Sequence, residues 1–265
     1  MADNRPIGIF DSGVGGLTVA NAIRQILPNE QLVYFGDTAH LPYGDKSRDT
    51  IIEYSQAIAT FLKEKNCKVI VIACNSASSN AFEKVCELVP EIPVINVIDP
   101  VVDYVIHLKA IKQIGVIGTK STIGTNAYEL KITQFDKTKF VSSMATPLFV
   151  PMIEEGFIFD DISNAIIRNY LSRNKIAGIE ALILGCTHYP IIKNQINKFY
   201  NFEIDIIDSA KIVAQHLQKI LFAAGLAAET KTEGNKYYVS DFTNYFQVIA
   251  KMFFEEEIEL ELVHL

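Results

Sequence analysis

Short apolar runs alternate along the chain with longer stretches in which apolar residues recur every three or four positions. The short runs are typical of buried strands, and the longer stretches are typical of amphipathic helices. The strand-like runs are PIGIF, QLVYFG, KVIVIA, PVINV, QIGVIG, ALILG, EIDII and KYYVS. Helical patterns include Thr50–Glu64, Ser76–Leu88, Ile123–Phe135, Ile158–Leu171 and Ala210–Ala223. Continuous apolar strands separated by helices predict an α/β protein whose parallel sheets are covered on both faces.

A weak internal repeat links the two halves of the chain. The run IGIFDSG, which begins at Ile7, resembles IGVIGTKS, which begins at Ile114. Cys74 ends a strand 67 residues after Ile7, and Cys186 ends a strand 72 residues after Ile114. Two similar α/β units, each with one thiol at the same strand end, are the simplest explanation. Because ligands gather beyond the carboxyl ends of parallel strands, both thiols are candidate site residues.

The repeat also suggests how the chain divides into domains. The tail segments KYYVS and IELELVHL follow the second unit, and we expect the C-terminus to return to the first one. We therefore assign residues 1–97 and 210–265 to a first α/β domain, which contains Cys74. Residues 98–209 form a second α/β domain, which contains Cys186.

Composition and charge narrow the class of protein. The chain has 265 residues, of which 49% are hydrophobic, and this is ample for a packed core. A net charge of −7 without a basic cluster argues against nucleic acid as a partner. The sequence shows no signal peptide and no apolar stretch of about 18 residues that could span a membrane. Four cysteines do not make a disulfide scaffold in so long a chain, so we expect a cytoplasmic protein with reduced thiols.

Polar loops follow several of the predicted strands. FDSGVGGLTVA comes after the first strand, HLPYG after the second, and CNSAS, GTKST and CTHYP after later ones. The first loop is not a dinucleotide fingerprint, because Gly13 and Gly15 are followed by Thr18 where that motif needs a third glycine. Hydroxyl, amide and backbone N–H groups at helix starts can hold an anion. Together the five loops predict one site that binds a small carboxylate.

The four cysteines differ in their surroundings. A lone cysteine that closes a strand is ordinarily a small buried residue. Cys86 lies in an apolar helical pattern and Cys67 precedes a strand, so we expect both to be inert. The repeated placement of Cys74 and Cys186 favours a functional pair. His188 lies two residues after Cys186 and is the one histidine close in sequence to a candidate thiol.

Four motifs, FDSGVGGLTV, PYG, ACNSAS and LGCTHYP, occur in this order between Ile7 and Pro190. With these motifs the chain resembles the glutamate racemases of the cofactor-independent aspartate/glutamate racemase superfamily. The resemblance implies two similar parallel-sheet α/β domains that face each other across a cleft, with one cysteine from each. It also implies interconversion of L- and D-glutamate, with the D-isomer destined for bacterial peptidoglycan. We expect no cofactor, no metal and a homodimer.

Matching the motifs position by position gives the expected site. The resemblance makes Cys74 and Cys186 the catalytic residues, with Asp11 as an acid/base helper near Cys74. Glu154 and His188 are the helpers expected near Cys186. The expected substrate-binding positions are Asp11, Ser12, Tyr43, Gly44, Asn75, Ser76, Thr187 and His188.

The sequence departs from the family pattern at two places. Ser76 stands where threonine is more frequent, but the hydroxyl group is kept. His40 stands where arginine is frequent, so we assign it no role. The assignment of Glu154 is less secure than the others, because Glu155 is its neighbour.

Two thiols suit racemisation, because a proton must leave one face of Cα and another must arrive on the opposite face. One thiolate acts as base and one thiol as acid, and exchanging their protonation states serves the reverse reaction. A free cysteine has a pKa of about 8.5, and a helix N-terminus after each cysteine is expected to stabilise the thiolate. A pyridoxal enzyme would need a lysine instead, and Lys120 in GTKST is the one lysine in these loops.

Three alternatives stay open. An aspartate racemase would use the same thiols, because the sequence does not show which side-chain length the pocket accepts. A two-lobed binding protein would share the cleft, but it has no use for paired thiols. A metal hydrolase would use Cys74, Cys186, His188 and Asp11, although the sequence lacks the usual ligand spacing.

Overall fold

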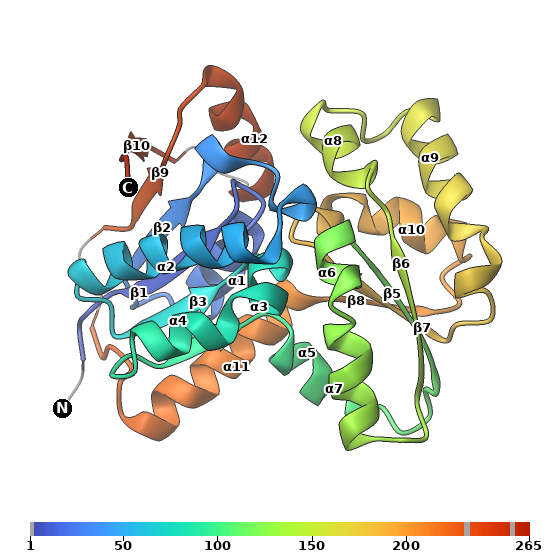
Figure 1. Cartoon of the computed structure of the whole chain (residues 1–265), viewed down its shortest axis with the longest axis horizontal. Coiled ribbons are helices and arrows are strands. Elements are labelled where there is room, and N and C mark those ends of the chain that lie inside the picture. The colour runs from blue at the N-terminus through green and yellow to red at the C-terminus, as the bar shows by residue number, and fades with distance from the viewer. Residues whose placement is uncertain (1–2, 231–233, 255–257) are drawn as a thin grey trace.

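The computed structural model describes residues 3–230, 234–254 and 258–265. Its strands form two sheets, one of six strands in the order β10-β9-β2-β1-β3-β4 and one of four strands in the order β6-β5-β7-β8. All the strand pairs in these ranges are parallel. Figure 1 shows the two sheets side by side, each with helices against it. We call the six-stranded sheet with its helices the first unit, and the four-stranded sheet with its helices the second unit.

The sheets confirm the predicted α/β class. The strands of the first unit are β1 (Ile7–Asp11), β2 (Leu32–Gly36), β3 (Val69–Ile72), β4 (Val94–Asn96), β9 (Lys236–Val239) and β10 (Leu260–Leu262). Those of the second unit are β5 (Gln113–Gly118), β6 (Phe140–Ala145), β7 (Ala181–Gly185) and β8 (Asp205–Asp208). β1, β2, β3 and β7 are buried over their whole length, as expected for strands covered on both faces.

Helices cover both sheets. Those of the first unit are α1 (Leu17–Ile26), α2 (Arg48–Glu64), α3 (Asn75–Asn80), α4 (Phe82–Leu88), α11 (Ser209–Ala224) and α12 (Asn244–Phe254). Those of the second unit are α5 (Asp99–Ile106), α6 (Lys120–Gly124), α7 (Ala127–Phe135), α8 (Phe149–Glu154), α9 (Asp161–Leu171) and α10 (Lys193–Phe199). Short 3₁₀ turns are η1 (Thr38–His40), η2 (Tyr43–Asp45), η3 (Asn174–Ile176) and η4 (Tyr189–Ile192). None of the helices described could cross a membrane, because each is too short or too polar.

The internal repeat of the sequence corresponds to a repeated strand order. The order β2-β1-β3-β4 in the first sheet recurs as β6-β5-β7-β8 in the second. Cys74 follows β3 and Cys186 follows β7, so the two thiols lie after equivalent strands. Since the strands of each sheet are parallel, both thiols lie at the carboxyl edge, where such sheets bind ligands.

The C-terminal segment returns to the first unit. β9 pairs with β2, and β10 pairs with β9. The strands of the first sheet therefore all lie within residues 1–97 or 210–265, and those of the second all lie within 98–209. The division of the chain into two domains at these boundaries stays a prediction.

Several elements differ from those that the hydrophobic pattern predicts. The apolar pattern missed β6, because FVSSMA is a partly polar edge strand in which Phe140 is 61% exposed. The helix predicted over Ser76–Leu88 is divided into two at Ala81. The helix predicted over Ile123–Phe135 is interrupted at Asn126, whose φ of 53° is left-handed, a conformation that asparagine tolerates better than most residues.

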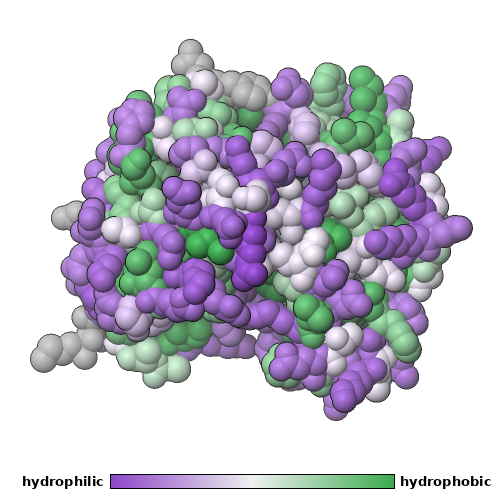
Figure 2. Space-filling view, in the orientation of Figure 1, coloured by the Kyte–Doolittle hydropathy of each residue, from purple (hydrophilic) through white to green (hydrophobic). Residues whose placement is uncertain are grey.

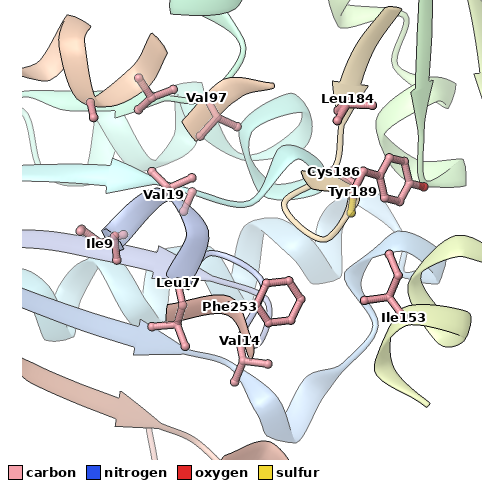
Figure 3. Packing of buried hydrophobic residues seen from close by; sticks show 14 of the residues in the cluster. Ile9, Val14, Leu17, Val19, Val97, Ile153, Leu184, Cys186, Tyr189 and Phe253 are labelled. Carbon is pink, nitrogen blue, oxygen red and sulfur yellow. The ribbon is translucent and has the colours of Figure 1, made fainter. Parts of the chain in front are cut away.

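One buried apolar cluster extends through both units. Ile9 and Leu17 of the first unit share it with Ile153, Leu184 and Tyr189 of the second (Figure 3). Separating the units would expose these side chains to water, so burial of the cluster holds the units together. The outer face in Figure 2 is mostly hydrophilic, with hydrophobic residues scattered over both units.

A buried ion pair fastens loops at the edge of the first unit. Lys68 Nζ lies 2.6 Å from Glu30 Oε2, and both side chains are almost completely buried. The same ammonium group donates hydrogen bonds to the carbonyl oxygens of Asp3 and Leu226. Glu30 Oε1 in turn accepts the N–H of Ala228 at 2.8 Å. Removing one partner would therefore leave the other charge buried without compensation.

We expect Lys68→Met to lower the free energy of unfolding by about 3–5 kcal/mol, measured by urea denaturation, because Glu30 would keep a buried and unpaired charge. Lys63→Met is the matched control, since Lys63 pairs with Glu91 on the surface. It should leave the urea midpoint nearly unchanged. Equal midpoints for the two variants would contradict a stabilising role of the buried pair.

Candidate active site

Both candidate thiols line one cavity between the two units. The cavity has a volume of about 130 Å³, which suits a small ligand. All but one of the residues predicted for the site line it. They are Ser12, Tyr43, Gly44, Cys74, Asn75, Ser76, Glu154, Cys186, Thr187 and His188.

Cys74 lies at the N-terminal end of α3, where its sulfur accepts the N–H of Ala77 at 3.4 Å. The thiol also lies 3.5 Å from Ser12 Oγ. Burial raises the pKa of Cys74 to about 12, and the charge of Asp11 adds to this effect. The Ala77 and Ser12 hydrogen bonds lower the pKa, as expected for a helix start, but burial has the larger effect. Cys74 is therefore a protonated thiol at neutral pH.

Cys186 has a different partner. Its sulfur lies 3.8 Å from His188 Nδ1, and His188 Nε2 lies 2.9 Å from Glu154 Oε1. Burial by itself lowers the pKa of His188, but the hydrogen bonds with Cys186 and Glu154 and the charges of both groups raise it to about 10. The imidazole is thus a cation at neutral pH, and it lies between a sulfur and a carboxylate.

The segment after Cys186 is not the α-helix that the sequence suggested. It is the four-residue turn η4, which carries Pro190 in its first turn, and α10 begins only at Lys193. The charge next to this thiol therefore comes from His188, whereas the N–H donor next to Cys74 comes from a helix.

Asp11 is the predicted site residue that does not line the cavity. Its side chain is completely buried, and Oδ2 accepts the N–H groups of Gly13 and Gly16 at 3.1 and 3.0 Å. Burial raises the pKa of Asp11, while His188 and the two N–H groups oppose this rise. The carboxyl group shapes the loop that carries Ser12, and it acts on Cys74 through its charge.

The glycine-rich loop after β1 serves close packing between the units. A Cβ atom at Gly15 would lie 2.5 Å from the imidazole of His188 and 2.7 Å from Thr187 Oγ1. Thr18 Oγ1 also lies 3.3 Å from the carbonyl oxygen of Thr187. A side chain at position 15 would therefore displace the histidine next to Cys186.

Polar contacts join the two units at the cavity. Ser76 Oγ lies 2.9 Å from Thr119 Oγ1, and both residues line the cavity. Lys120 Nζ lies 3.1 Å from Asp45 Oδ1, and both of these side chains are exposed by more than half. Lys120, the lysine considered for a pyridoxal site, is therefore one half of a surface ion pair.

His40 lies outside the cavity lining. Its Nδ1 lies 2.8 Å from Asp37 Oδ1, and its ring stacks on Tyr54. Asp37 Oδ2 accepts the hydroxyl of Tyr43 at 2.6 Å, while Ser240 donates to Oδ1. This network holds the PYG loop in place, and no direct role in the site follows for His40.

Comparison with known proteins identifies the family. Residues 16–217 match the family described as Asp/Glu/Hydantoin racemase. The chain belongs to this family. A glutamate racemase from Geobacter metallireducens is 42% identical over 238 residues, which cover 89% of this chain and 88% of the relative.

Solved structures of the family have the same architecture. Glutamate racemase from Francisella tularensis, in complex with D-glutamate, superposes with a TM-score of 0.93 at 44% identity and 98% coverage of both chains. Escherichia coli glutamate racemase, in complex with L-glutamate and the activator UDP-MurNAc-Ala, has a TM-score of 0.77 at 25% identity, over 94% of this chain and 95% of that one. An aspartate racemase from Picrophilus torridus, at 18% identity and a TM-score of 0.56 over 83% of this chain and 94% of that one, shares the fold alone.

Several residues of the racemase cavity were not assigned from the sequence. Thr119 belongs to the GTKST loop, which the sequence places at the site without pointing to this residue. Thr146 follows the missed strand β6, so no motif pointed to it. Val150 and Pro151 come from α8, which the apolar pattern of the sequence does not predict. In the described ranges, His, Cys, Asp and Glu side chains do not form a group of three or more that could hold a metal ion.

We expect the NMR signal of the His188 ring to titrate with a midpoint near pH 10. Glu154→Gln should lower this midpoint, because it removes the negative charge of the carboxylate that lies next to His188 Nε2. Since the folded pKa lies above the ordinary value of 6.5, the stabilisation from His188 is complete below about pH 6.5 and is lost as the pH rises through about 10. A midpoint at or below 6.5 would contradict the cation, and His188→Gln identifies the signal.

Proposed function

We propose that the protein interconverts L- and D-glutamate by proton transfer at Cα, with Cys74 and Cys186 as the two catalytic bases. The observation that carries this proposal is the pair of buried thiols that line one small cavity from equivalent strand ends of the two units. A binding protein would have no need to repeat a thiol in this way. A two-base racemase needs one on each side of the substrate carbon.

The surroundings of the two thiols support different roles in one direction of the reaction. Cys74, whose pKa is raised to about 12 by burial, is the thiol that donates a proton. Cys186 is the base that removes one, because the cationic His188 lies 3.8 Å from its sulfur. One turnover leaves Cys74 as the thiolate and Cys186 as the thiol, and this form serves the opposite enantiomer. Glu154 keeps His188 oriented and charged in both forms.

Proton transfer alone does not account for the rate that such a reaction needs. The Cα–H bond of an amino acid carboxylate is a very weak acid, and general acid–base catalysis contributes only about 10²–10⁴-fold. We attribute the rest of the rate enhancement to polar groups that are already in position around the substrate carboxylates before the reaction, in a cavity that excludes water. Ser12 and Thr187 are lining residues that offer such groups.

Glutamate is the preferred substrate of the proposal because of a difference in sequence identity. The glutamate racemase from Francisella tularensis, with D-glutamate, is 44% identical to this chain, whereas the aspartate racemase from Picrophilus torridus is 18% identical. We therefore place aspartate second. The supply of D-glutamate to peptidoglycan and the homodimer follow from the resemblance, whereas the cytoplasmic location follows from the composition of the sequence. All three stay predictions.

Purified protein should racemise L-glutamate in D₂O without an added cofactor and in the presence of a chelator, with little turnover of aspartate. Early in the reaction the D-glutamate should carry deuterium at Cα, while unreacted L-glutamate stays protonated, because the two bases act on opposite faces. Circular dichroism follows the ratio of the two enantiomers, and NMR follows the deuterium at Cα. Binding of glutamate without loss of optical rotation would refute the racemase, and rapid label in the starting enantiomer would refute two separate bases.

Cys74→Ala and Cys186→Ala should each lower the racemisation rate by at least about 10²–10⁴-fold, because each removes one acid/base group. Cys86→Ala is the matched control, since Cys86 is only partly buried and lies outside the cavity. It should keep full activity. Substantial turnover by either of the first two variants, measured in the same assay, would end the assignment of the thiols.

A further inference from the structure

Tyr128, at the start of α7 in the second unit, bonds to a residue of the first unit. Its hydroxyl donates to Asn75 Oδ1 at 2.7 Å, and both side chains are buried. Asn75 lines the cavity next to Cys74. Burial and the charge of Cys186 raise the pKa of Tyr128, so this hydroxyl keeps its proton and acts as a donor.

This hydrogen bond fixes the orientation of the Asn75 amide and leaves its NH₂ group for a ligand. With Oδ1 held by Tyr128, the remaining group is Nδ2, which is buried and has no hydrogen-bond partner among the described residues. An amide NH₂ group is a donor of two hydrogen bonds and suits a carboxylate. If the amide turned over, the Tyr128 proton would lose its acceptor and a carbonyl oxygen would face the substrate carboxylate.

Tyr128 also lies against the strand that leads to the other thiol. A Cβ atom at Gly185 would contact the Tyr128 ring at 3.4 Å and would lie 2.8 Å from the carbonyl oxygen of Ile117. The approach that requires a glycine here is that of the Ile117 carbonyl oxygen, and the Tyr128 ring lies within ordinary van der Waals reach of β7. Tyr128 thus lies beside the residue before Cys186 and bonds to the residue after Cys74.

We propose that Tyr128 is a positioning residue, which orients the Asn75 amide so that its NH₂ group donates to a carboxylate of the substrate. This inference rests on the proposed function, and it concerns binding rather than proton transfer. Tyr128 does not line the cavity, so it acts through Asn75.

Tyr128→Phe should raise the Kd for D-glutamate, measured by calorimetry, about tenfold, as expected for the loss of one well-oriented hydrogen bond to a charged group. The value of kcat should change less than about threefold, because the thiols are untouched. In the Asn75→Ala background the same change should have less than about a twofold effect, because the amide through which Tyr128 acts is gone. Tyr170→Phe is the matched control, since Tyr170 is also buried but packs on Phe149.

Asn75→Asp tests the orientation itself. A carboxylate at position 75 would still accept the Tyr128 hydroxyl, but its other oxygen would repel the substrate, so the Kd should rise at least as much as in Asn75→Ala. Retained affinity in Asn75→Asp, an unchanged Kd in Tyr128→Phe, or an equal loss in the Asn75→Ala background would overturn the proposal. A wild-type protein that binds D-glutamate without racemising it would refute the proposed function and leave these binding outcomes decisive for Tyr128.

Discussion

The distance between the two thiols is the constraint on which the rest of the structure depends. Two bases can act on one carbon only if the units that carry them keep a fixed separation. The apolar cluster shared by the two units provides this, since Leu17 of one unit and Tyr189 of the other are buried in the same cluster. Polar contacts such as Ser76–Thr119 set the position locally, and they contribute less to the total energy of association.

Close packing at the cavity explains residue choices that chemistry alone does not. Gly15 leaves room for His188, and Gly185 leaves room for the carbonyl oxygen of Ile117. Asp11 Oδ2 is hydrogen-bonded to the backbone of its own loop, and the charge of this carboxyl group raises the pKa of Cys74. The glycine-rich loop after β1 is therefore a packing surface for His188 of the other unit.

Much of the fold and site could be predicted from the sequence, for physical reasons that particular elements illustrate. Continuous apolar runs gave the central strands, because strands buried on both faces admit few polar residues. The apolar pattern does not predict β6, because an edge strand carries more polar residues. Its place follows instead from the repeat, in which it corresponds to β2. Tyr128 could not be inferred, because nothing in a linear pattern shows that its hydroxyl reaches Asn75 across the two units. The balance of burial and hydrogen bonding that keeps Cys74 protonated likewise depends on three-dimensional packing.

The unequal surroundings of the two thiols have a thermodynamic consequence for the proposed reaction. Enantiomers have the same free energy in water, and both directions pass through the same transition state. The two values of kcat/KM must therefore be equal, however different the two sides of the cavity are. The His188–Glu154 pair on the Cys186 side can make one enantiomer of the substrate bind more tightly only if that enantiomer also turns over more slowly. The asymmetry of the protein can therefore determine which enantiomer occupies the enzyme in a mixture, but it cannot change the equilibrium ratio of the two enantiomers in solution.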